Sequence, residues 1–373
     1  MNFEINQKIL LEHLNYVIRG ISSKNLIPIL NCIKLELTNE GLYLLSTNND
    51  IAIKTFIPSK QITKIINTGV IVVYGKYIYE IIRKLPNETI TIEEVIEDKI
   101  NIYTSKSSFY LNCNKTEDFP TLNLEEQSNP IKLNKRVLKN LINQTIFATS
   151  NDEARPHLTG LNIQVKEDIL KCTATDSYRL SSKEIKLDEK LSNEVNIIIP
   201  NKNIMELSKI ITDDDDFIEL HIFSNNIIFK FSDIIFMSRL INGTYPNTSA
   251  LIPNDFTLKL KVQRNDFYNS IDRASLLTNE FEKHTIKLEL KENDVTISSN
   301  IPEIGKVEEK IIVEKNNENN IIISFSSKYM LDALKSMEDE YIEILLNGEL
   351  KPIIIKNIND NSLTQLILPI RTY

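Results

Sequence analysis

The chain has 373 residues, 42% of them hydrophobic and 25% charged, and a formal net charge of −8. This length is too great for one ordinary core and predicts two or three domains. No apolar run approaches the roughly 18 residues of a membrane span, and the N-terminus lacks the basic and apolar regions of a signal peptide, so we expect a cytoplasmic protein. The negative charge argues against a nucleic-acid partner unless basic residues gather on one face.

A strand that runs into an amphipathic helix occurs three times, beginning at Phe3, Ile131 and Leu260. A second strand-to-helix pattern also recurs three times and contains Lys76, Lys202 and Lys328. Such self-similarity is typical of repeated structural units. The predicted helical windows are residues 7–20, 76–85, 134–148, 201–211, 263–277 and 327–337.

Alternating apolar and polar residues fill the segments between and after these helices, as in "CIKLELTNEGLYLLSTN", "GLNIQVKEDILKCTATD" and "TIKLELKENDVTISSN". Period-two alternation that is separated by Asn, Asp and Gly turns predicts antiparallel hairpins. The sequence therefore predicts an α+β protein of three repeated domains, each with two helices packed on antiparallel sheet. We expect the domains to span residues 1–123, 124–252 and 253–373.

The six helical windows contain 14 basic and 6 acidic residues, although the whole chain is acidic. This distribution predicts that the helices form an electropositive face suited to the phosphates of a DNA duplex, with no sequence preference. The alternative is that helices simply accommodate Lys and Arg well. Glu is an equally good helix former and is scarce in these windows, which favours the functional interpretation.

A catalytic or metal site is not visible in the sequence. The segment "GVIVVYGKY" from Gly69 lacks the spacing of a phosphate-binding loop, and the four histidines lie in separate elements without metal-ligand spacing. Cys32, Cys113 and Cys172 are far apart, so we expect neither a disulfide nor a zinc site. The acidic run at Asp213–Asp216 reads as a solvated turn. We therefore expect no enzyme activity and no cofactor.

Several short motifs, taken in order, resemble those of the bacterial β sliding clamp family of DNA polymerase III over the whole length of the chain. These motifs are "PIL" from Pro28, "EDFPTL" from Glu117, "RPHLTGL" from Arg155, "ATDSYRL" from Ala174, "SNNIIFKFSDIIFMSRL" from Ser224, "NGTYPN" from Asn242 and "LPIR" from Leu368. The resemblance implies a crescent of three DNA-clamp domains that dimerises head to tail into a ring. Twelve helices of about 10 Å each would leave an opening of roughly 28 Å, wider than a duplex of about 20 Å.

The function that the resemblance implies is that of a non-catalytic DNA polymerase processivity factor. The homodimer would encircle double-stranded DNA, slide along it and bind the polymerase III alpha subunit, the clamp loader, and other polymerases and repair proteins. These partners would insert short hydrophobic peptide motifs into a pocket between domains two and three. The alternatives are a monomeric β-rich protein-binding scaffold and an enzyme of nucleic-acid metabolism.

The peptide pocket is carried over from the family position by position. Its implied lining is Leu158, Thr175, Ser177, Tyr178, Arg179, Leu180, Pro246, Leu251, Leu366, Leu368, Pro369, Ile370 and Arg371. Without the resemblance, "TATDSYRL" reads as a hairpin end, and in either case we expect Asp176 to hold the turn. Two departures from the family are Ala250, where members often carry Arg, and Tyr373 beyond the usual chain end.

The resemblance also implies inner-wall and subunit contacts. The candidates for DNA phosphate contact are Lys24, Lys76, Arg83, Lys139, Arg155, Lys202 and Lys328, each of which could instead be a solubilising surface residue. At the joint between subunits, Phe109 and Leu111 would face Leu276 and Leu277. Ordinary core positions are the alternative for these four residues.

Overall fold

The computed structural model describes residues 1–21, 26–96, 98–191, 193–253, 255–279, 284–292 and 294–371. The chain divides into two compact units, Met1–Val137 with Lys202–Leu240 and Leu138–Asn201 with Ile241–Tyr373. The division passes through the segment expected as the middle domain, because its two sheet portions belong to different units. The three expected domain boundaries therefore stay a prediction.

The α-helices of the described residues are the six that the sequence pattern predicts, and each begins and ends within three residues of its predicted window. They are α1 Gln7–Val17, α2 Gly75–Lys84, α3 Lys135–Thr145, α4 Asn201–Ile210, α5 Arg264–Ser275 and α6 Ser327–Ser336. Short 3₁₀ segments, Ile18–Gly20 and Ile146–Ala148, continue α1 and α3. At α1 the side chain of Asn6 accepts a hydrogen bond from the backbone N–H of Lys8, which satisfies a donor of the first turn.

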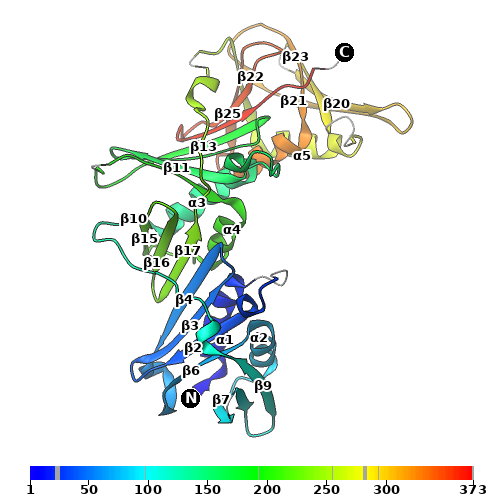
Figure 1. Cartoon of the computed structure of the whole chain (residues 1–373). Coiled ribbons are helices and arrows are strands. Elements are labelled where there is room, and N and C mark those ends of the chain that lie inside the picture. Colours follow the sequence, from blue (N-terminus) through cyan, green and yellow to red (C-terminus); the bar gives the residue numbers. More distant parts are fainter. Residues whose placement is uncertain are drawn as a thin grey trace. The chain divides into compact units, whose positions relative to one another are not determined.

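One large antiparallel sheet forms the first unit, in the order β10-β15-β16-β17-β4-β3-β2-β6-β9-β8-β7-β1-β5 (Figure 1). Its strands are β1 Asn2–Asn6, β2 Cys32–Leu37, β3 Gly41–Thr47, β4 Ile51–Pro58, β5 Ile62–Asn67, β6 Gly69–Tyr74, β7 Thr89–Ile96, β8 Lys99–Tyr103, β9 Ser108–Asn114, β10 Ile131–Asn134, β15 Phe217–Ile222, β16 Asn226–Phe231 and β17 Ile234–Arg239. The pairing of β17 with β4 makes the sheet continuous across the expected boundary between the first two domains. Helix α1 packs on β3 and β4 through a buried face that includes Leu10, Leu14 and Val17.

The second unit contains a nine-stranded sheet, β14-β11-β12-β13-β26-β25-β24-β18-β22, and a four-stranded sheet, β21-β20-β19-β23. Their strands are β11 Gly160–Lys166, β12 Ile169–Thr175, β13 Arg179–Lys186, β14 Val195–Pro200, β18 Leu258–Gln263, β19 Thr285–Lys291, β20 Asp294–Ile301, β21 Gly305–Ile312, β22 Glu314–Lys315, β23 Ile321–Ser326, β24 Tyr341–Leu346, β25 Ile353–Asn357 and β26 Leu363–Ile367. Residues of α5 and α6, among them Phe267, Ile271, Met330 and Leu334, fill the core between the sheets. The antiparallel pairing confirms the predicted α+β class.

Candidate functional site

The turn between β12 and β13 contains the segment "TDSYR" that the sequence marks as a pocket wall. Ser177 adopts a φ of +78°, and Asp176 Oδ1 accepts hydrogen bonds from the backbone N–H groups of Tyr178 (2.9 Å) and Arg179 (3.0 Å). These bonds replace backbone pairing within the turn. The prediction that Asp176 holds the turn is confirmed.

The side chain of Arg179 is directed into the protein and is only 9% exposed. Its Nε donates to Asp176 Oδ2 at 3.1 Å, its Nη1 donates to Asp332 Oδ2 on α6 at 2.7 Å, and its Nη2 donates to the carbonyl oxygen of Phe147 at 2.7 Å. The guanidinium also lies over the rings of Tyr329 (4.5 Å) and Phe147 (5.5 Å). We call this group the Arg179 junction. Its partner on α6 is 153 residues away in the sequence, so no local pattern could have identified it.

Apolar residues of the predicted pocket divide between buried clusters and exposed positions. Leu180 and Leu366 lie opposite each other in the β13–β26 pair and are buried with Leu345 and Ile354. Leu158 is buried with Ile198 and Tyr245. Burial raises the pKa of the Tyr245 hydroxyl, which lies close to Thr175 and Asp176. The buried apolar residues form the floor of the predicted pocket, and a ligand would first contact the exposed ones.

The chain end runs beside the turn. Leu368 donates its backbone N–H to the carbonyl of Tyr178 at 2.9 Å, and Ile370 donates to the carbonyl of Ser324 at 2.7 Å. Tyr178 is 53% exposed and Leu368 38% exposed, so apolar surface from two distant segments is presented together. Ser177, Pro246, Leu251 and Arg371 are also exposed, and Pro369 and Ile370 are half-buried. Ala250 is exposed, and Tyr373 lies outside the described residues.

A second buried polar network, which sequence reasoning missed, lies close to the same strands. Gln144 Nε2 on α3 donates to Glu338 at 3.0 Å, and its backbone carbonyl accepts from Ser181 Oγ at 2.6 Å. Gln365 Nε2 on β26 donates to Ser336 Oγ at 2.8 Å. The Nε2 groups of both amides donate to residues from distant segments, which fixes β13, β26, α3 and the end of α6 to one another, whereas Gln144 Oε1 is buried without a partner in the described residues.

An ion pair between Lys183 and Asp360 (2.5 Å) adds a further connection to this region. Burial by itself would raise the pKa of Asp360, but hydrogen bonds from Lys183 and Ser362 outweigh it and lower the pKa to about 2. The pair ties β13 to the loop before β26.

The predicted DNA-contact residues fall into two groups. Lys76, Lys202 and Lys328 are exposed and Lys139 is half-buried, and in the described part of the chain no carboxylate oxygen lies within 4.0 Å of any of their ammonium groups. Arg83 pairs with Glu80 at 2.6 Å, and Arg155 pairs with Asp152 at 3.1 Å.

Arg155 also donates to Ser177 Oγ at 2.8 Å, so it lies against the β12–β13 turn. Lys24 lies outside the described residues. The unpaired lysines are therefore the better candidates for phosphate contact.

The acidic run Asp213–Asp216 is more than a solvated turn. Lys135, at the start of α3, is only 2% exposed, and its ammonium contacts Asp214 (3.0 Å) and Asp216 (3.3 Å). Arg136 pairs with Asp213 (3.2 Å) and Asp215 (3.4 Å). We call these contacts of Lys135 the Lys135 cluster. Lys135 and Arg136 are thus neutralised within the fold. In the described part of the chain six of the 14 helical cations have a carboxylate partner, namely Arg19, Arg83, Lys135, Arg136, Lys209 and Arg273. The sequence count therefore overstates the charge that is free to attract phosphate.

The predicted subunit-contact residues are exposed or half-buried. Phe109 is 38% exposed and Leu276 is 79% exposed, whereas Leu111 and Leu277 are half-buried. On the side of β9 away from β8, only Cys113 and Asn114 pair with β6. Residues 108–112 therefore leave one edge of the strand unpaired by the described strands.

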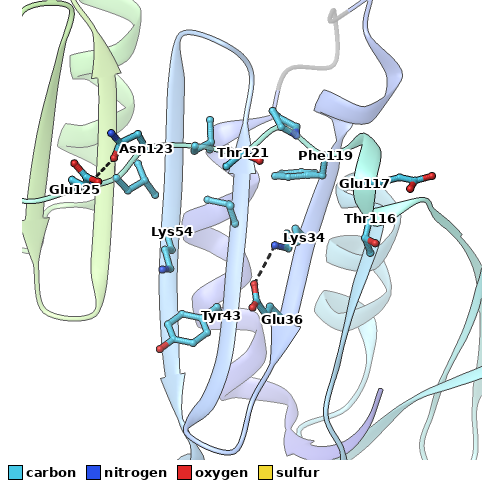
Figure 2. Close-up of a pocket in the computed structure, with 14 residues that line it drawn as sticks. Lys34, Glu36, Tyr43, Lys54, Thr116, Glu117, Phe119, Thr121, Asn123 and Glu125 are labelled. Carbon is cyan, nitrogen blue, oxygen red and sulfur yellow. Dashed lines mark hydrogen bonds and ion pairs between the residues drawn. The ribbon is translucent and has the colours of Figure 1, made fainter.

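The groove in Figure 2 lies elsewhere, on the outer face of β2, β3 and β4 beneath residues 116–125. Lys34 pairs with Glu36 across its floor at 3.1 Å, and Lys54 lies over the ring of Tyr43 at 4.6 Å. The overlying segment is fixed by Phe119, which packs with Cys32 and Val72. Both cations (Lys34 and Lys54) and carboxylates (Glu36, Glu117 and Glu125) line this groove, so its charge favours no single class of ligand.

Glu126, Glu219 and His221 bring possible metal-ligand atoms within 4.8 Å of one another. However, His221 Nδ1 accepts a hydrogen bond from the backbone N–H of Gln127 at 2.8 Å, which leaves the proton of the neutral ring on Nε2, the nitrogen that faces the carboxylates. Lys230 pairs with Glu126 and Lys132 with Glu219. The arrangement fixes Gln127 to β15 and Glu126 to β16, and it leaves no lone pair on Nε2 for an ion.

Within the described residues, no helix combines the length and apolar character that a bilayer span requires.

Comparisons with known proteins agree along the whole chain. Three family models match in order: the N-terminal domain of the DNA polymerase III beta subunit at residues 1–123, its central domain at 132–247 and its C-terminal domain at 249–371. A beta sliding clamp of Bacillus subtilis is 40% identical over 378 residues and covers 100% of both chains.

Solved structures give the same result. The chain is similar to the crystal structure of the sliding clamp from Bacillus subtilis with a TM-score of 0.96 and 40% identity, and to the DNA polymerase III beta chain from Streptococcus pneumoniae with a TM-score of 0.94 and 34% identity. Each comparison covers 100% of both chains.

Proposed function

Because this chain belongs to the DNA polymerase III beta subunit family, we propose that it is a processivity factor whose ring-shaped homodimer encircles duplex DNA. It is a non-catalytic subunit that slides on DNA and tethers the replicative polymerase. The observation that carries this conclusion is the full-length similarity, with three beta-subunit models in order and a TM-score of 0.96 to a sliding clamp. The place of action would be the cytoplasm.

Topological retention tests this function directly. A clamp that has been loaded onto nicked circular DNA should remain bound through gel filtration at high salt and should leave after the circle is linearised, because encirclement does not depend on phosphate contacts. Equal loss from circular and linear DNA would contradict the ring and favour a monomeric protein-binding scaffold.

The peptide site that we propose for partner proteins lies around the β12–β13 turn and the chain end. Exposed Tyr178 and Leu368 would contact apolar anchors of a peptide, above the buried Leu180 and Leu366. Leu368→Ala should weaken a Gln-Leu-Ser-Leu-Phe peptide about tenfold and leave the dimer intact, whereas Leu350→Ala, at another exposed leucine, should leave peptide affinity unchanged. Equal affinities for both variants would remove this assignment.

DNA contact is proposed for the lysines without a carboxylate partner. Lys76→Glu, Lys202→Glu and Lys328→Glu together should reduce duplex affinity at low salt and reduce the slope of affinity against salt, because each removes a phosphate-neutralising charge. Arg83→Glu is the comparison, since Arg83 is already paired with Glu80 and should change affinity less. An unchanged salt slope in the triple variant would contradict the assignment.

The subunit joint is proposed between the end of domain one and the start of domain three. Exposed Phe109 and Leu276, the unpaired edge of β9 and the edge strand β21 are the surfaces that a second copy would cover. An uncovered strand edge invites pairing with another chain, so its burial in a dimer would remove that hazard. Light scattering should give twice 43.0 kDa for the chain and the monomer mass for Phe109→Glu with Leu276→Glu.

A further inference from the structure

We infer that Arg179 is a positioning residue for the proposed peptide site: it holds α6 and the β12–β13 turn in the peptide-competent arrangement and does not itself contact the peptide. This inference rests on the proposed function of the site. The geometry that points to it is the Arg179 junction, which joins a turn, the 3₁₀ segment after α3 and helix α6 through one side chain.

The hydrogen-bonding capacity of Arg179 is largely used inside the protein. A guanidinium has five N–H groups in a planar fork, and all three of its nitrogens donate to protein acceptors here. The aromatic rings of Tyr329 and Phe147 cover it further, and only 9% of the residue is exposed. A ligand would therefore find few free donors at this side chain, although the family resemblance places it in the pocket lining.

The neighbours of Arg179 are the residues that would meet the peptide. Tyr178 precedes it, and the carbonyl of Tyr178 accepts the N–H of Leu368, so the position of the turn also sets the position of the chain end. Leu180 follows it and lies opposite Leu366 in the β-ladder. When the guanidinium leaves Asp332, the turn and α6 lose the hydrogen bond that joins them and keep only the contact of Arg179 with the Tyr329 ring, so the apolar surface at Tyr178 and Leu368 is held less firmly.

A positioning role predicts a particular kinetic signature. If the competent arrangement is only partly populated, the apparent affinity falls in proportion to that population, while the contacts in the bound state are unchanged. The association rate constant should therefore fall and the dissociation rate constant should not rise. Loss of a direct contact has the opposite signature, because it destabilises the complex and speeds dissociation.

The experiment measures both rate constants for a labelled Gln-Leu-Ser-Leu-Phe peptide on the full-length dimer. Arg179→Lys keeps the charge but loses the planar fork, and Asp332→Asn removes the charged acceptor on α6 without touching Arg179. We expect each variant to slow association about three- to tenfold with dissociation unchanged, and the double variant to be no slower than Arg179→Lys. Arg136→Met, which removes an exposed and ion-paired arginine, is the matched control and should bind at the wild-type rates.

Other results would overturn the inference. Faster dissociation with unchanged association in Arg179→Lys would show a direct peptide contact, and wild-type rates in Asp332→Asn would show that α6 is not involved. If Arg179→Lys does not fold, Asp332→Asn alone decides between these outcomes. A wild-type chain that is retained on circular DNA but binds no peptide would overturn both this inference and the proposed peptide site. Normal peptide binding by the wild type, with wild-type rate constants in both Arg179→Lys and Asp332→Asn, would overturn this inference alone.

Discussion

The Lys135 cluster and the Arg179 junction each bury one cation among two aspartates, yet the surroundings of the aspartates differ. At Lys135 the carboxylates of Asp214 and Asp216 are 42% and 76% exposed, and both belong to one short loop. At Arg179 the carboxylates of Asp176 and Asp332 are 13% and 30% exposed and come from segments far apart in the sequence. The first cation anchors a loop whose carboxylates are well solvated, and the second joins separate elements through carboxylates that are less exposed to water.

This difference determines what each cation contributes. When a buried cation is removed, the cost depends on whether its former partners can be hydrated again. Asp214 and Asp216 can be hydrated again. Hydrogen bonds, first from Thr212 and then from Lys135, lower the pKa of Asp214. Asp176 and the carbonyl of Phe147 cannot be hydrated as easily, so the Arg179 junction should be the more sensitive of the two.

The largest effect is expected for Arg179→Met. Removal of the guanidinium leaves two carboxylates and a carbonyl without their donor, and we expect local unfolding of β13 and α6 to become easier by about 3 kcal/mol. Native-state hydrogen exchange of amides in these elements should speed up by about two orders of magnitude. An increase in the exchange rates of less than threefold would mean that the Arg179 junction fixes the arrangement of these elements without stabilising them.

Lys135→Met should have a smaller effect, about 1–2 kcal/mol at α3 and the 213–216 loop. The exposed aspartates regain water, although their mutual repulsion then increases. The same hydrogen-exchange measurement, made on amides of α3 and β15, gives the comparison directly. A loss of stability as large as that in Arg179→Met would show that the exposure of the partner carboxylates does not determine how much stability is lost when the cation is removed.

The sequence could predict what depends on local order. The six helices follow from apolar residues at helical spacing, and the Asp176 turn follows from an Asp that accepts the backbone N–H groups two and three residues later. In contrast, the sequence treats Lys135 as one more helical cation and Arg179 as pocket lining. Asp214 lies 79 residues from Lys135 and Asp332 lies 153 residues from Arg179, and no period or spacing encodes such contacts.

The resemblance proposes which residues make up the candidate site, and the structure shows how those residues are arranged. Resemblance supplied Leu180, Leu366 and Leu368, but their division into buried floor and exposed surface depends on the β13–β26 pairing. Gln144, Gln365 and Tyr329 were missed because polar and aromatic residues in helices and strands carry no signal of the distant group that they satisfy. The pairing of β17 with β4 joins the sheets of two expected domains. The local alternation of apolar and polar residues could not predict this pairing either.

The Lys183–Asp360 ion pair allows the comparison to be extended by changing the pH. The folded-state pKa of Asp360 is about 2, below its ordinary 3.8, so its ionisation stabilises the fold above pH 3.8 and this stabilisation is lost as the pH falls toward 2. Since Asp360 is 42% exposed, we expect the contribution to be about 1 kcal/mol. Protection factors of β26 amides, which compare the observed exchange rate with that of the unfolded chain at the same pH, should fall more between pH 5 and pH 3 in the wild type than in Asp360→Asn. Parallel curves would contradict the pair's role.

The smallest effect is expected at His13 on α1, where a buried side chain has no salt-bridge partner in the described residues. Burial lowers the pKa of His13 below its ordinary 6.5, against the opposing effects of Glu12 and Asp233, and Nδ1 lies 2.7 Å from Thr55 Oγ1. The unfolded chain therefore binds the proton more readily, so stability is full above pH 6.5 and falls as the pH drops below it. Melting temperatures at pH 7.5 and pH 5.5 should differ by about 2 °C more in the wild type than in His13→Gln, which can keep a hydrogen bond to Thr55. An equal difference in both proteins would mean that His13 accepts its proton without disturbing the packing of α1 on β4, and that burial alone does not make this position sensitive to acid.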